Sequence, residues 1–218
     1  KPPQVGSRFY QPAMATTLTR LAEEGLDSFY RGPLAEVLAH GMETLGLPVT
    51  LADLNAHAAR RTTPLKLEHQ QGEIFNHAPP TQGLVSLAIL GITDRLNMAE
   101  ADDADTLHRI VEATKLAFSL RDAHITDPRA LKTDVQKLLD PAALQALADR
   151  VDDSRAAPWG TGKGPGDTVW MGVMDSSGLA VSFIQSLYHE FGSGVVLPDT
   201  GIVWQNRGAS FSLDPRSE

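Results

Sequence analysis

The feature that most constrains this fold is a stretch rich in glycine and proline that leads directly into two strand-like runs. Residues 160–166, with the sequence GTGKGPG, are typical of a loop. Strand-like runs follow at residues 168–174 and 179–188, and the turn-forming sequence Asp-Ser-Ser-Gly separates them at 175–178. This pattern predicts an antiparallel hairpin that begins immediately after a flexible segment.

The hairpin also predicts which side chains lie close to one another. If Asp175 and Gly178 close the turn opposite each other, Thr168 falls opposite Gln185, with Ser186 adjacent. Directly opposed residues on paired strands have Cβ atoms about 4.5–5.5 Å apart. The hairpin therefore brings a polar pair of side chains to Thr168.

The junction between Asp167 and Thr168 has a possible chemical role. If this bond is cut, Thr168 becomes an N-terminus whose hydroxyl is a nucleophile and whose α-amine is a base within reach. The pKa of an α-amine is ordinarily about 7.7–8.0, so a useful fraction is neutral near pH 7. A linker that ends in a strand explains the same residues, and the local sequence taken alone favours that simpler interpretation.

The remainder of the chain alternates helical patterns with a short strand pair, which predicts an α+β fold. Apolar residues at helical spacing, together with Pro and Gly at the ends, predict helices before and after the strand pair. The expected helices cover residues 12–24, 33–45, 84–96, 104–124, 131–139 and 142–150, with strands at 65–68 and 73–76 and a third strand-like run at 201–204. The sequence contains no internal repeat.

Composition excludes several classes of protein. The 218 residues are 42% hydrophobic, enough for a sizeable core, and the net charge of -8 argues against a nucleic-acid or anionic-membrane partner. The chain has no cysteine, hence no disulfide and no cysteine nucleophile. It shows no membrane-spanning run and no signal peptide, although Lys1-Pro2-Pro3 does not look like a natural start. We expect a cytoplasmic location, with the periplasm as the alternative.

No cofactor or metal site is expected. The glycines of 160–166 do not form a phosphate loop, because Lys163 is followed by Gly-Pro and a strand rather than by Ser or Thr and a helix. The histidines show no metal-ligand spacing, and His108 and Glu112 on one helix face are expected to be a solvated pair. The chain also lacks the G-x-S-x-G turn of a serine hydrolase.

Several runs spread along nearly the whole chain match one known pattern. They are Phe29-Tyr30-Arg31-Gly32-Pro33, Pro79-Pro80-Thr81-Gln82-Gly83, Val111-Glu112-Ala113-Thr114-Lys115, Phe191-Gly192-Ser193-Gly194 and, most specifically, Gly166-Asp167-Thr168. Together they resemble the γ-glutamyltranspeptidase family of N-terminal-nucleophile hydrolases. The resemblance implies part of an αββα sandwich, in which helices pack on antiparallel sheets. It also implies that the chain is a central fragment of a longer proenzyme.

The resemblance implies roles for individual residues. The family's proenzyme cuts itself before the threonine that matches Thr168, which would be the nucleophile of both cleavage and catalysis. Residues 1–167 would then be the C-terminal part of the large subunit, and residues 168–218 the start of the small subunit. Ser186 matches a threonine whose hydroxyl lies beside the nucleophile, and Asn206 matches an asparagine of the substrate pocket.

The chain departs from the family pattern in the substrate pocket. Ser210 stands where the transpeptidases have an acid that holds the substrate's α-ammonium, Tyr188 stands at an asparagine position, and Arg207 adds a positive charge. Loss of a charged hydrogen bond costs on the order of 2–4 kcal/mol of discrimination. The site should therefore favour an anionic or neutral acyl group. Residues 204–208 (WQNRG) resemble the subgroup that includes oxamate amidohydrolase and acylase-like members.

The sequence thus predicts an autoprocessing amidohydrolase or transferase that forms an acyl-enzyme on Thr168, with a small anionic amide such as oxamate as substrate. A genuine γ-glutamyltransferase or glutathione hydrolase is the first alternative. A non-catalytic homologue is the second, because Ile184, Tyr188 and Ser210 all depart from the pattern. The family's carboxylate-binding arginine and oxyanion glycines lie outside this chain, and losing one oxyanion donor costs roughly 10²–10³ in rate. We expect the remaining segments of the proenzyme to be its partner, the chain alone to be inactive, and its Asp167–Thr168 bond to be intact.

Overall fold

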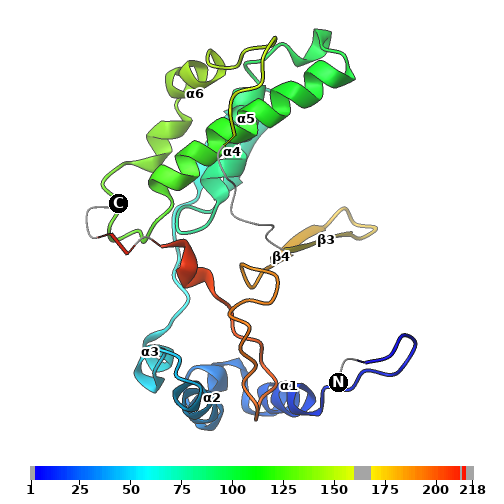
Figure 1. Cartoon of the computed structure of the whole chain (residues 1–218), viewed down its shortest axis with the longest axis vertical. Coiled ribbons are helices and arrows are strands. Elements are labelled where there is room, and N and C mark those ends of the chain that lie inside the picture. The colour runs from blue at the N-terminus through cyan, green and yellow to red at the C-terminus, as the bar shows by residue number, and fades with distance from the viewer. Residues whose placement is uncertain (1–2, 160–167, 212, 215–218) are drawn as a thin grey trace. The chain divides into compact units, whose positions relative to one another are not determined.

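The structure is a computed structural model that describes residues 3–159, 168–211 and 213–214, with residues 100 and 210 described by their main chain alone. Its contacts divide into two compact units. The first comprises Lys1–Ala59 and Gly164–Gly208, and the second comprises Arg60–Lys163 and Ala209–Glu218 (Figure 1). The units do not follow the order of the chain, because the segment after Thr168 packs with the N-terminal helices.

The first unit begins with a group of short helices whose starts are encoded locally. They are α1 (Pro12–Glu24), the 3₁₀ helix η1 (Leu26–Phe29), α2 (Pro33–Thr44) and α3 (Leu51–Ala56). Both α1 and α2 carry Pro in their first turn, where the missing amide hydrogen costs nothing. Helix α3 starts at a capping box in which Thr50 and Asp53 exchange hydrogen bonds. The predicted helix at 12–24 is confirmed with the same bounds.

The core of the first unit joins α2 to the segment that follows the second hairpin. Leu34, Leu38 and Met42 of α2 are fully buried, and Leu197 packs against them from far along the chain. The Thr17 hydroxyl of α1 donates a buried hydrogen bond of 2.9 Å to the Thr200 carbonyl. These contacts attach residues 197–200 to the N-terminal helices.

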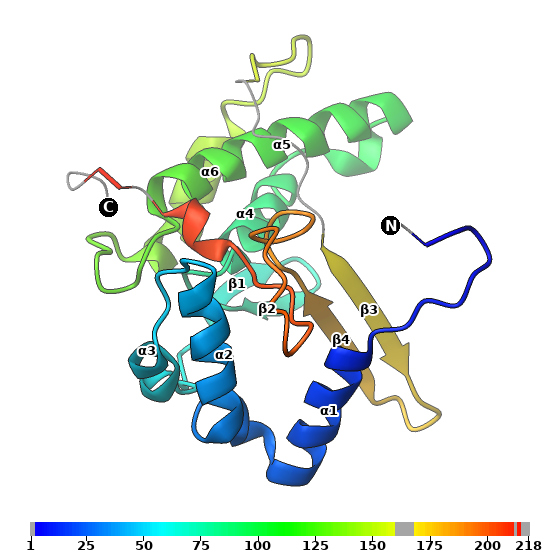
Figure 2. The ribbon, with the colours of Figure 1, turned by 60° about the horizontal axis from the view of Figure 1, so that its bottom comes forward.

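The second hairpin of the chain, β3 (Val169–Met174) and β4 (Ala180–Gln185), also belongs to the first unit (Figure 2). Its two strands are antiparallel, as predicted, and every residue of both strands is exposed. The 3₁₀ helix η4 (Arg207–Ser210) follows later in the chain. The predicted third strand at 201–204 is reduced to a single bridge between Val196 and Val203.

The second unit is built on the first hairpin. Strands β1 (Leu65–His69) and β2 (Gly72–Asn76) pair antiparallel, with Leu67 opposite Ile74. Helix α4 (Gly83–Thr93) lies beside this hairpin (Figure 2) and is buried along most of its length because nearly all its residues are apolar. The other elements are η2 (Met98–Glu100), α5 (Asp103–His124), η3 (Val135–Leu139) and α6 (Pro141–Ala148). Side chains from β1, α4, α5, η3 and α6 form one core.

Two sequence expectations about the second unit are wrong. The helix expected at 131–139 is only the short η3, because Asp134 caps the Gln136 amide and the Gln136 side chain pairs with both main-chain groups of Lys66 at 3.0 and 2.8 Å. The solvated His108–Glu112 pair is also wrong. Glu112 is only 4% exposed, and it binds Lys115 and the main chain of Ala157 instead.

The α+β class is confirmed, with helices packed on the β1–β2 hairpin. Among the described residues, no helix combines the length and the apolar character needed to cross a membrane. Within the same described ranges, no cluster of three or more His, Asp or Glu side chains could hold a metal ion.

Candidate active site

Thr168 and Ser186 stand at the open end of the β3–β4 hairpin. Val169 is paired with Gln185, so the next position outward brings Thr168 opposite Ser186. The Thr168 hydroxyl donates a hydrogen bond of 3.1 Å to the Ser186 hydroxyl. Thr168 is exposed and Ser186 is half-buried, so the pair lies at the surface of the first unit.

The predicted register is wrong by one residue, and the turn explains the shift. The Asp175 amide donates to the Leu179 carbonyl at 3.0 Å, so the loop contains three residues rather than two. Gly178 adopts a φ of 87°, the left-handed conformation that closes such loops. The Asp175 carboxylate accepts from the amides of Ser177 and Leu179 and fixes the turn. In the observed register Thr168 lies opposite Ser186 instead of Gln185. The predicted proximity of Ser186 to Thr168 is therefore seen, although the predicted pairing with Gln185 is not.

The loop after β4 is held in a strained conformation. Tyr188 has a φ of 84°, a region that residues with side chains rarely adopt. Its amide donates to the Ser186 hydroxyl at 3.0 Å, so Ser186 both accepts from Thr168 and stabilises the loop. Strain of this kind costs of order 1–3 kcal/mol and persists only where surrounding contacts impose it.

Asn206 supplies those surrounding contacts. Its side-chain oxygen accepts the His189 amide at 3.1 Å, and its own amide donates to the Leu187 carbonyl at 3.1 Å. The guanidinium carbon of Arg207 lies 5.4 Å from the centre of the Tyr188 ring, a distance at which a cation is attracted to the ring face. Asn206 and Arg207 therefore hold the strained loop from one side.

The glycines that follow shape an open hollow of about 500 Å³ lined by residues 189–194. Gly192 has a φ of 58°, and a Cβ there would lie 2.4 Å from the Trp204 carbonyl oxygen, so only glycine fits. Ser193 donates to the same carbonyl at 2.8 Å through its amide and at 2.8 Å through its hydroxyl. The absence of a side chain at Gly192 therefore lets the backbone of this loop pack closely against the Trp204 carbonyl.

Comparison with known proteins identifies the group to which this geometry belongs. The family described as Gamma-glutamyltranspeptidase matches residues 1–218, the whole chain. The chain belongs to the γ-glutamyltranspeptidase family. Among solved structures, this member of the family is similar to a cephalosporin acylase from Bacillus halodurans, with a TM-score of 0.86 and 35% identity over 99% of this chain and 39% of that one. Its fold is that of the N-terminal-nucleophile hydrolases, as the sequence predicts.

Curated relatives of this family member are longer proteins. An oxamate amidohydrolase proenzyme of Klebsiella pneumoniae subsp. pneumoniae is 77% identical over 214 residues, which are 98% of this chain and 40% of that protein. A glutathione hydrolase-like proenzyme of Bacillus subtilis is 36% identical over 220 residues, 98% of this chain and 41% of that protein. The chain therefore spans about 40% of the length of these relatives.

The structure places most of the predicted site residues of this family member near one another. Hydrogen bonds and a ring contact connect Thr168, Ser186, Tyr188, Asn206 and Arg207 into one continuous set within the first unit. Asp167 lies outside the described residues. Ser210 ends η4, and its side chain is likewise outside what is described.

One contributor to this set was missed from the sequence. His189 takes part through its main chain, since its amide binds Asn206, and its ring centre lies 4.7 Å from that of Tyr188. The sequence gives no signal for either contact, because both depend on the left-handed turn at Tyr188. His189 also lines the hollow formed by the glycine loop.

Proposed function

We propose that this chain is part of an autoprocessing amidohydrolase in which Thr168 is the nucleophile. The single observation that carries the proposal is the hydrogen bond of 3.1 Å from the Thr168 hydroxyl to Ser186, at the residue immediately before β3. A second hydroxyl at this distance can orient the nucleophile and can accept its hydrogen bond. The same hydroxyl accepts the Tyr188 amide, so its position is fixed by the loop.

The first step of the proposed chemistry is cleavage of the chain. The Thr168 hydroxyl oxygen attacks the carbonyl carbon of Asp167, the bond from that carbon to the Thr168 nitrogen breaks, and the nitrogen takes up a proton. Water then hydrolyses the resulting ester and releases the carboxylate of Asp167. The products are a chain that ends at residue 167, belonging to the large subunit, and a small subunit that begins with Thr168 and its free α-amine.

The second step is turnover of an amide substrate. The freed α-amine of Thr168 takes the hydroxyl proton as the oxygen attacks the substrate carbonyl, and the proton passes to the leaving amine. The acyl group remains on Thr168 until water releases it. An amine in place of water would make the enzyme a transferase. The remaining segments of the longer proenzyme would complete the site.

We propose a small anionic amide, such as oxamate, as the substrate class. Arg207 supports this choice because it holds a positive charge beside Tyr188, and the sequence has Ser210 where the family pattern has an acid. The identity of 77% to an oxamate amidohydrolase proenzyme supports it further. The glutathione hydrolase proenzyme of Escherichia coli is 30% identical, so a γ-glutamyl substrate is the alternative that the experiment must exclude. The cytoplasmic location stays a prediction.

The proposal is tested on the full-length protein and its Thr168→Ala variant. Mass spectrometry should find the wild type split between residues 167 and 168 and the variant uncut. Ammonia release from oxamate should exceed hydrolysis of a γ-glutamyl anilide, and the variant should lose at least about 10³-fold in activity. Thr16→Ala, which removes an exposed hydroxyl from α1, should behave as the wild type.

Three results would contradict this proposal. A wild type that hydrolyses amides without splitting at this bond would exclude Thr168 as an N-terminal nucleophile. Strong γ-glutamyl turnover with no release from oxamate would overturn the substrate assignment alone. A protein with neither cleavage nor turnover would be a non-catalytic homologue.

A further inference from the structure

Tyr188 has a backbone conformation that its side chain makes costly. Its φ of 84° lies in the left-handed region, which glycine adopts freely and residues with a Cβ rarely adopt. Glycine occupies the other positive-φ positions of the same loop, Gly192 and Gly194. Among the described residues other than glycine, Tyr188 alone has a positive φ. The turn itself favours glycine, so the ring must contribute something that the turn does not require.

The main chain of this turn is connected to the proposed nucleophile through a single side chain. The Tyr188 amide donates to Ser186 Oγ at 3.0 Å, and the same oxygen accepts from the Thr168 hydroxyl at 3.1 Å. A hydroxyl oxygen has two lone pairs, and these two contacts use both. The amide of Tyr188 therefore determines where the acceptor for the Thr168 hydroxyl lies.

Asn206 holds the turn on both sides of Tyr188. Its side-chain oxygen accepts the His189 amide at 3.1 Å, and its own amide donates to the Leu187 carbonyl at 3.1 Å. The Leu187 carbonyl and the His189 amide belong to the two planar peptide groups that flank the Tyr188 Cα. Because both peptide groups are bound to one residue, rotation of the backbone at Tyr188 is restricted.

The ring of Tyr188 contacts two other side chains. The guanidinium carbon of Arg207 lies 5.4 Å from the ring centre, and the His189 ring centre lies 4.7 Å away with the ring planes at 63°. A cation within about 6 Å of a ring centre is attracted to the ring face, and edge-to-face ring pairs are a favoured arrangement. The ring therefore holds the Arg207 guanidinium beside the turn that places Ser186.

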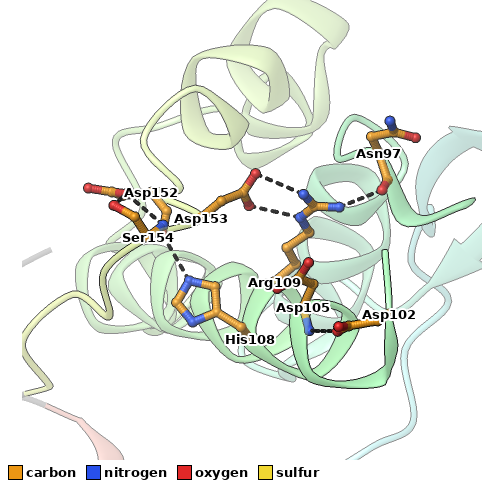
Figure 3. Close-up of polar contacts among 8 residues, drawn as sticks. All are labelled: Asn97, Asp102, Asp105, His108, Arg109, Asp152, Asp153 and Ser154. Atoms are coloured by element: carbon orange, nitrogen blue, oxygen red, sulfur yellow. Dashed lines mark hydrogen bonds and ion pairs between the residues drawn. The ribbon is translucent and has the colours of Figure 1, made fainter. Parts of the chain in front are cut away.

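Figure 3 shows a different way in which this chain holds an arginine. There the Arg109 guanidinium donates two hydrogen bonds of 2.8 Å to the Asp153 carboxylate. A carboxylate accepts the same N–H bonds that an anionic substrate would accept, and it cancels the charge of the arginine. An aromatic face attracts a guanidinium without accepting its in-plane N–H bonds. The contact seen at Arg207 is therefore of the kind that orients a cation and preserves its charge.

We infer that Tyr188 is a positioning residue with two separable roles: its main chain places the acceptor for the Thr168 hydroxyl, and its ring places the guanidinium of Arg207. This inference rests on the proposed function, in which Thr168 attacks a small anionic amide. The main-chain role affects attack by the hydroxyl, so its loss lowers kcat. The ring role affects binding of the substrate's charge, so its loss raises KM. The side chain of Asn206 serves the main-chain role alone, because it binds a backbone amide.

The ring role is tested on the full-length protein, with ammonia release from oxamate as the assay and rates expressed per split molecule. Tyr188→Gly keeps the amide and the left-handed turn but removes the ring, so KM should rise about threefold to thirtyfold while kcat changes less than about twofold. Tyr188→Phe keeps the ring face and should restore the KM of the wild type. Tyr10→Gly removes an exposed tyrosine ring from the same unit and should change neither constant.

The main-chain role is tested by two pairs of variants in the same assay. Tyr188→Ala lacks the ring, as Tyr188→Gly does, but keeps a Cβ that disfavours the left-handed turn, so its kcat should be about threefold to tenfold below that of Tyr188→Gly. Asn206→Ala removes the acceptor of the His189 amide and should lower kcat about threefold to thirtyfold, with KM within about twofold. Asn206→Asp keeps an acceptor oxygen and should restore kcat. Asn55→Ala, a change at an exposed asparagine of α3, is the matched control and should alter neither constant.

A merely structural role for Tyr188 would give different results. Loss of packing alone would lower the melting temperature and change kcat and KM together, with Tyr188→Ala no slower than Tyr188→Gly, and that pattern overturns the inference. If wild type releases ammonia from oxamate and Tyr188→Gly keeps the wild-type KM, the ring role fails while the proposed function stands. A fall in kcat in Asn206→Ala that Asn206→Asp does not restore would overturn the main-chain role. If wild type neither splits nor turns over oxamate, the proposed function fails together with this inference.

Discussion

The two hairpins of this chain have similar lengths and opposite environments. In β1, Leu65 and Leu67 are 4% and 1% exposed and pack in the core beside α4. In the β3–β4 hairpin every residue is exposed, including Trp170 at 63% and Phe183 at 49%. The first hairpin alternates apolar and polar residues, whereas the second is apolar on both faces. Alternation is typical of a sheet with one solvated face, and continuous apolar strands are typical of a sheet covered on both.

This contrast shows that one hairpin contributes to the stability of the core, whereas the other carries the proposed nucleophile. A lone two-stranded hairpin is marginally stable in water, so a hairpin needs either a helix or further strands against it. The β1–β2 hairpin packs against the helix α4, which lies within the described residues. The β3–β4 hairpin exposes apolar side chains along both of its strands, an exposure that is typical of surfaces that bind other segments or molecules. Thr168 and Ser186 stand at the open end of this hairpin. The proposed nucleophile therefore depends on the hairpin whose strands are exposed among the described residues.

The largest effect expected from this comparison is on stability. Leu67→Ala should lower the free energy of unfolding of the 218-residue chain by about 2–5 kcal/mol, because the side chain is buried against α4 and α6. Phe183→Ala removes an even larger side chain from the exposed hairpin and should cost less than about 0.5 kcal/mol. Urea unfolding of both variants provides the measurement. Equal costs would show that the second hairpin is already buried in this chain.

The second effect is on the rates of cleavage and turnover, and it concerns only the β3–β4 hairpin. Ser186→Ala removes the acceptor of both the Thr168 hydroxyl and the Tyr188 amide, so the rates of cleavage and turnover of the full-length protein should fall roughly tenfold to a hundredfold. Ser186→Thr keeps a hydroxyl and should restore most of both rates. Ser186→Ala should also lower the free energy of unfolding by about 1 kcal/mol, because the Tyr188 amide loses its acceptor, whereas Ser186→Thr should leave it nearly unchanged. A Ser186→Ala protein with wild-type rates would remove this residue from the site.

The third effect compares two glycines, one in the helix α4 beside the first hairpin and one within a strand of the second hairpin. At Gly91 of α4, a Cβ would lie 2.6 Å from Leu144 and 3.1 Å from Leu67, both of which are buried. At Gly172 of β3, a Cβ would lie 2.7 Å from the ring of Trp170, which is exposed and can move. Gly91→Ala should therefore destabilise the chain by about 1–2 kcal/mol after the gain in helix propensity.

The matched variant at the exposed hairpin should be far milder. Gly172→Ala should change the unfolding free energy by no more than about 0.5 kcal/mol, although it should disturb the 2.8 Å hydrogen bond from Trp170 to Ser182. Thermal and urea unfolding of the two variants test this difference. If Gly172→Ala proved the more damaging, the hairpin would be held more rigidly than its exposure indicates.

The sequence was sufficient where local chemistry decides the outcome. Pro at the first turn of α1 and α2 marks helix starts that the structure confirms. Apolar runs and turn residues likewise predicted both hairpins. These features depend on neighbours in the chain, which a single sequence displays directly.

The sequence was insufficient where a distant partner or a rare backbone conformation decides. The burial of Glu112 depends on Ala157, 45 residues away, and no helical period predicts that contact. The left-handed turn at Tyr188 depends on two hydrogen bonds: the Ser186 hydroxyl accepts from the Tyr188 amide, and the Asn206 side-chain oxygen accepts from the His189 amide. The register of the β3–β4 hairpin depends on the Asp175 carboxylate, which accepts the amide of Ser177 in the same turn. The loop is one residue longer than predicted, and this shifts every pair of residues between the two strands by one position.

The smallest effect concerns how the two turns are held. The turn of β1–β2 is fixed from outside, since Asp94 at the end of α4 accepts from the Gln70 amide at 3.0 Å. The turn of β3–β4 is fixed from within by Asp175. The Ser177 hydroxyl, followed by the amides of Ser177, Leu179 and Gly178, lowers the pKa of Asp175 below its usual value.

A lowered pKa has a definite sign for stability. The contribution of Asp175 to the turn should be fully present above the pKa that the group has when unfolded, about 3.9, and should be lost as the pH falls through the lower folded value. Carboxyl-carbon NMR titration of the chain should therefore give a midpoint for Asp175 below about 3.9, and Ser177→Ala should move that midpoint upward. A midpoint at or above about 3.9 would mean that the exposed hairpin opens at its turn, and that the register which brings Thr168 to Ser186 needs the rest of the protein to hold it.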